Sequence, residues 1–149
     1  MLLNIVTDEE LLISEVVKTI LLILLTVAVI YNLYRIIRGG KKVRASLNIV
    51  FVCLIATLIF FVGREFLKEA ALLKNYQYVP GITKDYCDVV ALGKGIEFEY
   101  EVNGKLYHNC NTFYPASLDS ILVPGGKFQV RVSLKYPYEG RMDFHKHIK

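Results

Sequence analysis

The sequence lacks the short motifs that mark the common classes of catalytic site. It contains no GxSxG, HExxH or CxxC pattern. Gly93-Lys94-Gly95 and Pro124-Gly125-Gly126 are rich in glycine, but neither has the strand–loop–helix context of a phosphate-binding loop. The chain is therefore expected to be non-enzymatic, with no catalytic residue, cofactor or metal ion.

Two groups of polar residues come closest to a ligand site, and neither meets the requirements of one. His145 and His147 lie two positions apart near the C-terminus, without a third ligand at the spacing of a zinc site. The second group is a row of three acidic residues at alternate positions, which on a strand would place their carboxylates about 7 Å apart on one face. We interpret it as a solvated face, because exposed strand faces commonly carry charge. The row consists of Glu97, Glu99 and Glu101.

Charge is absent from two long stretches in the first half of the chain. Thr19–Tyr34 has no charged residue, and the run extends to Val16–Tyr34 if the Lys18 amine reaches toward the interface. Ala45–Gly63 is a second uncharged run. At about 1.5 Å per residue such runs cover roughly 28 Å, which matches the hydrocarbon core of a bilayer. Residues 16–34 and 45–63 are therefore predicted to span a membrane.

The ends of both helices are marked in the sequence. Thr7-Asp8-Glu9-Glu10 has the pattern of a capping box, with Thr7 as the N-cap and Glu10 reaching back to it. Gly39-Gly40 predicts the end of the first helix. Arg64–Leu73 contains good helix formers and no breaker, so the second helix is expected to continue through it. Residues 1–75 are thus predicted to form an antiparallel transmembrane hairpin that extends beyond the membrane on the terminal side.

The orientation of the hairpin is predicted from its cations. The first 17 residues contain no Lys or Arg, which is not typical of a signal peptide. Five cations and no acid lie in the connecting segment, which favours a cytoplasmic loop and places both termini outside. The opposite orientation stays open, because four cations lie at the other end. The topology determinants are Arg35, Arg38, Lys41, Lys42 and Arg44, and the opposing cations are Lys18, Arg64, Lys68 and Lys74.

Residues 76–149 show the period of two that is typical of half-buried strands. In Ile96–Val102, apolar and acidic residues alternate, and Asn103-Gly104 is a strong hairpin signal before a return strand at Lys105–Tyr114. Two-residue and Gly-bulge turns both fit, so the register stays open. Lys127–Ser133 predicts a third strand. Its residues Phe128, Val130 and Val132 are expected to face the core, and Gln129 and Arg131 to face solvent.

Weaker strand patterns complete the second domain. They lie at Gly81–Val90 and Arg141–His145, and Pro115–Ile121 is expected to be a loop with one short helical turn. The predicted fold class is membrane α+β, with the hairpin (1–75) followed by an antiparallel sheet or partial barrel of about five strands (76–149). So small a domain has a thin core, and additional constraints are expected.

Cysteine pairing is one such constraint. Cys87 and Cys110 lie on strands expected to be near each other, and a disulfide between them would stabilise the domain by roughly 3 kcal/mol. It would form only outside a reducing cytosol, and two separate buried thiols fit the sequence equally well. Cys53 lies in the middle of the second span and is interpreted as a packing residue.

Several segments together resemble a known group of proteins. Ile96–Tyr107, Gly125–Ser133 and Tyr136-Pro137 are similar to small bacterial two-span membrane proteins of unknown function. In these, a V-N-G-K-x-Y hairpin precedes a G-x-x-(F/V)-x-V strand and a Y-x-P or N-P turn. The resemblance covers roughly residues 79–144 and implies a membrane-tethered β domain that acts as an interaction module. It implies no catalytic residue. Tyr136-Pro137 stands where Asn-Pro is more common.

Eight of the ten tyrosines lie after residue 75, and tyrosine is favoured in protein interfaces. The residues predicted to form a partner surface are Tyr86, Tyr107, Phe113 and Tyr114.

Recognition of another protein is the function that these features favour. We expect an accessory subunit or an immunity-type protein at the bacterial inner membrane, with its termini and β domain outside the cytoplasm. Its partners are the lipid bilayer and a second protein or a second copy. Nucleic acid is not expected, because residues 76–149 carry nine cations against eight acids. The alternative is a two-span β-barrel sensor-effector of a bacterial anti-phage system that binds a cyclic nucleotide in the cytosol.

Overall fold

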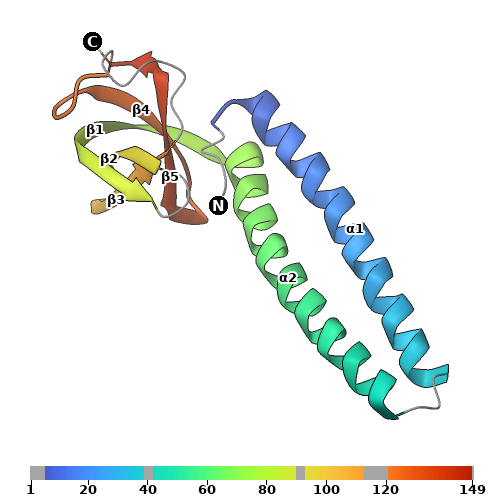
Figure 1. Ribbon diagram of the computed structural model, residues 1–149. Coiled ribbons are helices and arrows are strands. Elements are labelled where there is room, and N and C mark those ends of the chain that lie inside the picture. The colour runs from blue at the N-terminus through green and yellow to red at the C-terminus, as the bar shows by residue number, and fades with distance from the viewer. Residues whose placement is uncertain (1–5, 39–41, 90–92, 113–120, 149) are drawn as a thin grey trace. The chain divides into compact units, whose positions relative to one another are not determined.

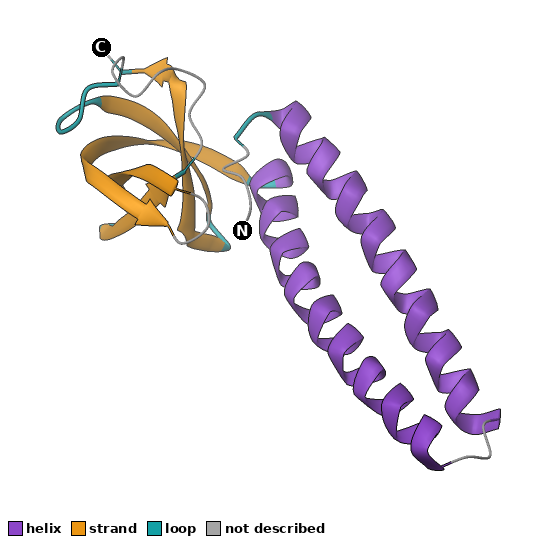
Figure 2. Cartoon of the chain, in the orientation of Figure 1, coloured by secondary structure: helices purple, strands orange, loops and turns teal. Residues whose placement is uncertain are grey.

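A computed structural model describes residues 6–38, 42–89, 93–112 and 121–148 (Figure 1). Two long helices precede five strands, which confirms the predicted pair of helices followed by a small antiparallel sheet (Figure 2). By its internal contacts the chain divides into a unit of Met1–Leu11 with Lys68–Lys149, and a unit of Leu12–Leu67. The elements are α1 (Asp8–Arg38), α2 (Lys42–Lys74), β1 (Tyr76–Val89), β2 (Gly93–Val102), β3 (Lys105–Asn111), β4 (Lys127–Ser133) and β5 (Tyr136–His147).

Both helices are long and apolar enough to span a membrane. Their most apolar stretches contain no buried residue, so large side chains such as Leu24, Leu54 and Phe60 lie on the helix surfaces. Helix α2 continues without interruption to Lys74, as predicted. Cys53 lies exposed on this helix.

The capping box at the start of α1 is confirmed. The backbone N–H of Glu10 donates to Thr7 Oγ1 (3.3 Å), and the Glu10 carboxylate accepts from the backbone N–H groups of Thr7 and Val6 (3.2 Å each). Burial raises the pKa of Glu10, but these hydrogen bonds stabilise the carboxylate and outweigh it. The net effect lowers the pKa below its ordinary value. Val6 and Thr7 are thereby fixed ahead of the first helical turn.

The sheet has the strand order β3-β2-β1-β4-β5, with every neighbouring pair antiparallel. The long strand β1 is central, because its first part (Tyr76–Ile82) pairs with β4 and its second part (Gly81–Val89) pairs with β2. A register shift between Thr83 and Asp85 lies in the second part. One strand thus carries both halves of the sheet.

The structure determines the register of the β2–β3 hairpin. Asn103 and Gly104 both have positive φ (53° and 75°), and Val102 pairs with Lys105 across a two-residue turn. Positive φ at both central positions defines the turn favoured by Asn-Gly. Strand β3 ends at Asn111, which is earlier than predicted, and Tyr114 lies outside the described residues, as does most of the loop predicted at Pro115–Ile121.

The core lies on one face of the sheet. Phe128, Val130 and Val132 have no exposed area, as their alternation predicted. Tyr100 is also buried; its hydroxyl donates to the Pro137 carbonyl (2.8 Å) and accepts from the Gly140 N–H (2.9 Å). Burial raises the pKa of Tyr100 to about 12. The buried cluster is completed by Ile96, Phe98, Val102, Ile121, Met142 and Phe144.

The two end strands of the sheet, β3 and β5, are joined by side chains. Asn109 Nδ2 donates to the Gly140 carbonyl (2.9 Å), and Asn111 Nδ2 donates to the Met142 carbonyl (2.8 Å). Asn109 Oδ1 also accepts from the Cys110 N–H (2.9 Å), so one amide group bridges the backbones of both strands. In the described residues no backbone ladder connects β3 with β5. The sheet therefore curls into a partial barrel closed by asparagine amides.

Candidate interaction surface

The sheet face opposite the core, called the outer face below, has two parts with different surroundings. The covered half comprises the outer-face residues of β4, β5 and the first part of β1. The open half comprises those of β2, β3 and the second part of β1. Covered-half side chains such as Arg131 and Arg141 are 1% and 2% exposed. Open-half side chains such as Lys84 and His108 are 45% and 54% exposed.

Arg131 lies at the centre of the covered half and contacts three separate segments. Its Nε donates to the Leu72 carbonyl at the end of α2, and its Nη1 donates to the Val6 carbonyl ahead of α1 (2.9 Å each). Its Nη2 lies 2.6 Å from Asp8 Oδ1. The guanidinium also lies 3.7 Å from the centroid of the Tyr76 ring. One side chain of β4 thus holds the end of one helix, the start of the other and the first residue of β1.

An ion pair with both partners buried lies beside it. Arg141 on β5 donates through Nη2 to Glu69 Oε1 of α2 (3.0 Å), and both side chains are at most 3% exposed. Lys68, one residue earlier on α2, forms an ion pair with Glu139 of β5. The two arginines with Asp8 and Glu69 are called the arginine clasp below. It fixes the outer ends of α1 and α2 to the sheet through charge-assisted hydrogen bonds.

The burial of Arg131 corrects a prediction from the sequence. Arg131 has the expected outer-face position on β4, but it does not face solvent, because Val6, Asp8 and Leu72 cover it. A usable signal was present in the strand pairing. Arg131 lies directly opposite Arg141 on β5, and two like charges opposite each other destabilise a sheet unless acids from elsewhere neutralise them. Asp8 and Glu69 are those acids.

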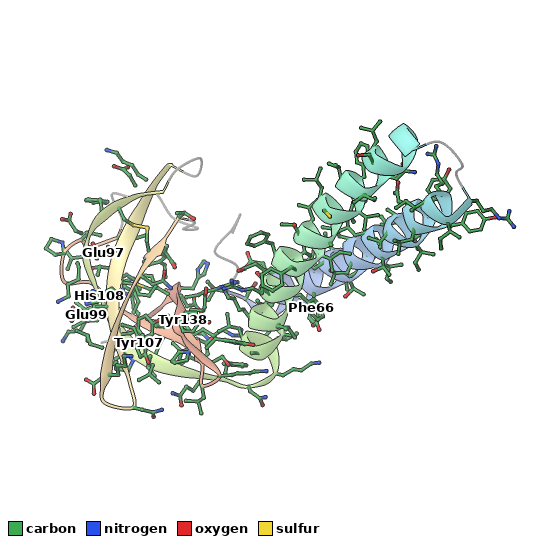
Figure 3. All side chains as sticks on the ribbon, turned by 90° about the horizontal axis from the view of Figure 1, so that it is seen from below. Phe66, Glu97, Glu99, Tyr107, His108 and Tyr138 are labelled. Atoms are coloured by element: carbon green, nitrogen blue, oxygen red, sulfur yellow. A yellow bond between two sulfur atoms is a disulfide. The ribbon has the colours of Figure 1, made fainter. Side chains whose placement is uncertain are left out.

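The open half carries the acidic row. Glu99 Oε1 forms an ion pair with Lys84 Nζ (3.1 Å), and Glu99 Oε2 lies 4.0 Å from His108 Nδ1. Figure 3 shows His108 and Glu99 close together, with Glu97 farther along the same strand. Leu106, opposite Glu101, is 50% exposed. The surface therefore combines charged side chains with an exposed apolar side chain.

A disulfide joins Cys87 of β1 to Cys110 of β3 at one end of the open half. These strands are not neighbours, because β2 lies between them, and the bond crosses β2 at Gly95. A Cβ at Gly95 would lie 2.7 Å from Cys110 Sγ and 2.5 Å from the Asn111 carbonyl oxygen. Glycine at this position makes room for the crossing. The open half is thus held by a covalent bond, where the covered half is held by ion pairs.

The tyrosines predicted to form a partner surface have different environments. Tyr86 is 50% exposed and lies opposite Ile96, whereas Tyr107 lies opposite Tyr100, four residues farther along β2. That separation is about 13 Å, so the structure does not bring the two rings together. Tyr107 stacks on Tyr100 and packs against the core. Phe113 and Tyr114 lie outside the described residues.

The predicted topology determinants lie at the other end of the helices. Arg35 and Arg38 are exposed in the last turns of α1. Lys41 lies outside the described residues, and Lys42 and Arg44 belong to α2 with side chains that are not described. Across the described part of the chain, no group of three histidine, cysteine or carboxylate side chains is arranged to hold a metal ion.

No protein-family model, curated protein or solved structure matches this chain.

Proposed function

We propose that this protein is a non-enzymatic, membrane-anchored interaction module, acting as an accessory subunit or an immunity-type protein at the bacterial inner membrane. Its two apolar helices span the bilayer, and its β domain presents the open half to another protein. The arginine clasp is the observation that carries this proposal. Among the described residues, the helix ends occupy one half of the outer face, while side chains of the open half such as Lys84, His108 and Leu106 remain exposed.

The clasp holds the helix ends on the covered half, so the open half is the surface proposed to bind a partner. A buried guanidinium that loses its carboxylate partner is left as an uncompensated charge, which costs about 3–5 kcal/mol. Residues 8–11 and 68–74 therefore stay attached to the sheet, and β1 starts two residues after α2 ends. A flexible linker between helix and sheet is absent from this described segment.

The proposal places the β domain outside the cytoplasm. Five cations within residues 35–44, at and around the connection between the helices, favour a cytoplasmic loop. The Cys87–Cys110 disulfide supports the same orientation, because disulfides persist in oxidising compartments. The cyclic-nucleotide sensor requires the opposite orientation, so one topology experiment separates the two functions.

That experiment is thiol labelling of a Cys53→Ala variant with a membrane-impermeant reagent in intact spheroplasts. Labelling of Cys87 and Cys110 that appears only after treatment with an impermeant reductant would support an external, disulfide-bonded domain. Labelling that appears only after lysis would place the domain inside and overturn the proposed orientation. Cyclic nucleotides would then be tested as ligands.

Binding by the open half is tested with a photocrosslinking residue at Leu106, compared with the same residue at Leu134. Both leucines are exposed (50% and 60%), but Leu134 lies in the turn between β4 and β5. We expect one discrete adduct from position 106, and its loss on reversing the charge with Glu99→Lys and Glu101→Lys. Equal adducts from both positions, or an adduct unaffected by charge reversal, would contradict a specific surface.

A further inference from the structure

The last turns of α1 carry a basic and aromatic face that the proposed function does not use. Tyr31, Tyr34, Arg35 and Arg38 are spaced i, i+3, i+4 and i+7, so they lie on one side of the helix. All four are exposed. The Arg35 guanidinium lies 5.8 Å from the Tyr31 ring centroid, and the Arg38 guanidinium lies 4.8 Å from that of Tyr34. These four residues are called the Tyr–Arg face below.

Within the described residues, neither guanidinium has an internal counterion. The sequence contains no Asp or Glu between Glu15 and Glu65. Accordingly, no carboxylate in the described residues forms an ion pair with Arg35 or Arg38. The two arginines are one helical turn apart, so their positive charges repel each other. Their charges are therefore available to an anion from outside the chain.

The geometry selects the kind of anion. A guanidinium held over an aromatic ring keeps its N–H edge free, and that edge matches the oxygens of a phosphate group. The tyrosines lie at the end of the uncharged run, where amphipathic rings favour the headgroup level of a bilayer. Phosphate oxygens are available at that depth as lipid headgroups.

We propose that the Tyr–Arg face binds the phosphate of anionic phospholipid headgroups. The inference rests on the membrane insertion assumed in the proposed function. It assigns to Arg35 and Arg38 a ligand, in addition to their contribution to topology. Arginine supplies paired donors to the phosphate, and the tyrosine rings hold the guanidiniums in position.

The test uses the purified full-length chain in phosphatidylcholine vesicles that contain trace spin-labelled phosphatidylglycerol or spin-labelled phosphatidylcholine. The fraction of each lipid immobilised by the protein is measured by electron paramagnetic resonance. We expect phosphatidylglycerol to be preferred on the order of tenfold, because its headgroup carries a net negative charge and that of phosphatidylcholine does not. The double variant Arg35→Gln, Arg38→Gln should lose this preference, and Tyr31→Leu, Tyr34→Leu should reduce it.

Lys18→Gln, Arg64→Gln is the matched control, because it removes two cations at the other end of the hairpin. It should keep the preference. Three cations remain near the loop in the Arg35→Gln, Arg38→Gln variant, so its orientation should be retained.

The outcomes separate this proposal from the one on which it rests. Immobilised phosphatidylcholine without any preference for phosphatidylglycerol would show insertion and overturn the lipid site alone. No immobilised lipid of either kind would overturn membrane insertion, and with it both proposals. Loss of the preference on adding inorganic phosphate at constant ionic strength would assign the face to free phosphate and overturn the lipid as its ligand.

Discussion

The two halves of the outer face belong to one sheet and share strand β1, yet their charged residues have opposite surroundings. In the covered half, Arg141 and Glu69 are nearly excluded from solvent. In the open half, Lys84 and Glu99 form an ion pair of similar length whose side chains are 45% and 21% exposed. Strand sequence alone therefore does not decide whether an outward-facing charge is buried. Segments far away in the chain decide it, by occupying one half of the face.

Because one ion pair is buried and the other is not, the two should contribute differently to the free energy of unfolding. A surface pair is screened by water and contributes about 0–1 kcal/mol. A buried pair has already lost its hydration, so each partner depends on the other. Variants that remove one partner at a time test this difference directly.

The largest effect is expected from Glu69→Gln. The substitution preserves the shape of the side chain but removes the charge that faces Arg141, and should destabilise the protein by about 3–5 kcal/mol. Unfolding of the detergent-solubilised protein by denaturant measures this loss. Glu99→Gln is the matched control in the open half and should cost no more than about 1 kcal/mol. Equal losses for the two variants would remove the distinction between the halves.

The second effect concerns the covalent bond of the open half. Cys87→Ser, Cys110→Ser opens a loop with a sequence separation of 23 and should cost roughly 3 kcal/mol. Unfolding in the presence and absence of a reductant measures the contribution of the bond. Cys53→Ser should leave the midpoint unchanged, because this free thiol lies in α2. A double variant as stable as the wild-type protein would show that the disulfide does not form.

A third prediction concerns the contact between β2 and β5 in the core. The pKa of Tyr100 is about 12 in the folded chain, compared with an ordinary value near 10. The unfolded chain therefore releases this proton first. Stability should be constant below about pH 10, fall by about 2–3 kcal/mol as pH rises toward 12, and then level off.

Tyr100→Phe tests the assignment of this pH dependence. The variant should lack it, and should be less stable at neutral pH by about 1–3 kcal/mol, because the Gly140 N–H and Pro137 carbonyl lose their partner. Tyr138→Phe is the control, since Tyr138 is 50% exposed. Persistence of the full alkaline decrease in Tyr100→Phe would assign it to another group.

Local patterns in the sequence predicted the elements that depend on neighbouring residues. The uncharged runs predicted α1 and α2, Thr7 and Glu10 predicted the cap, and Asn103-Gly104 predicted the hairpin. The covered half depends on contacts over much longer distances. Arg131 bonds to residues 59 and 125 positions away, which no periodicity encodes. The bridging role of Asn109 was not predicted either, because the sequence does not indicate which backbone groups the amide of a polar strand residue will contact.

The smallest effect is expected at the capping box. This motif orders the segment that covers Arg131, so it tests how far the covered half depends on the start of α1. Glu10 fixes the N–H of Val6, and the carbonyl of Val6 accepts from Arg131. Glu10→Ala should cost about 1 kcal/mol, measured by denaturant unfolding at neutral pH.

The folded chain holds the pKa of Glu10 below its ordinary value, so the stabilising contribution of the carboxylate is present above the ordinary pKa and is lost as pH falls through the lowered pKa. Glu10→Gln keeps an acceptor oxygen but cannot titrate, so it should lack this acidic component. An identical acidic decrease in Glu10→Gln and the wild-type protein would show that Glu10 does not stabilise the covered half through its charge.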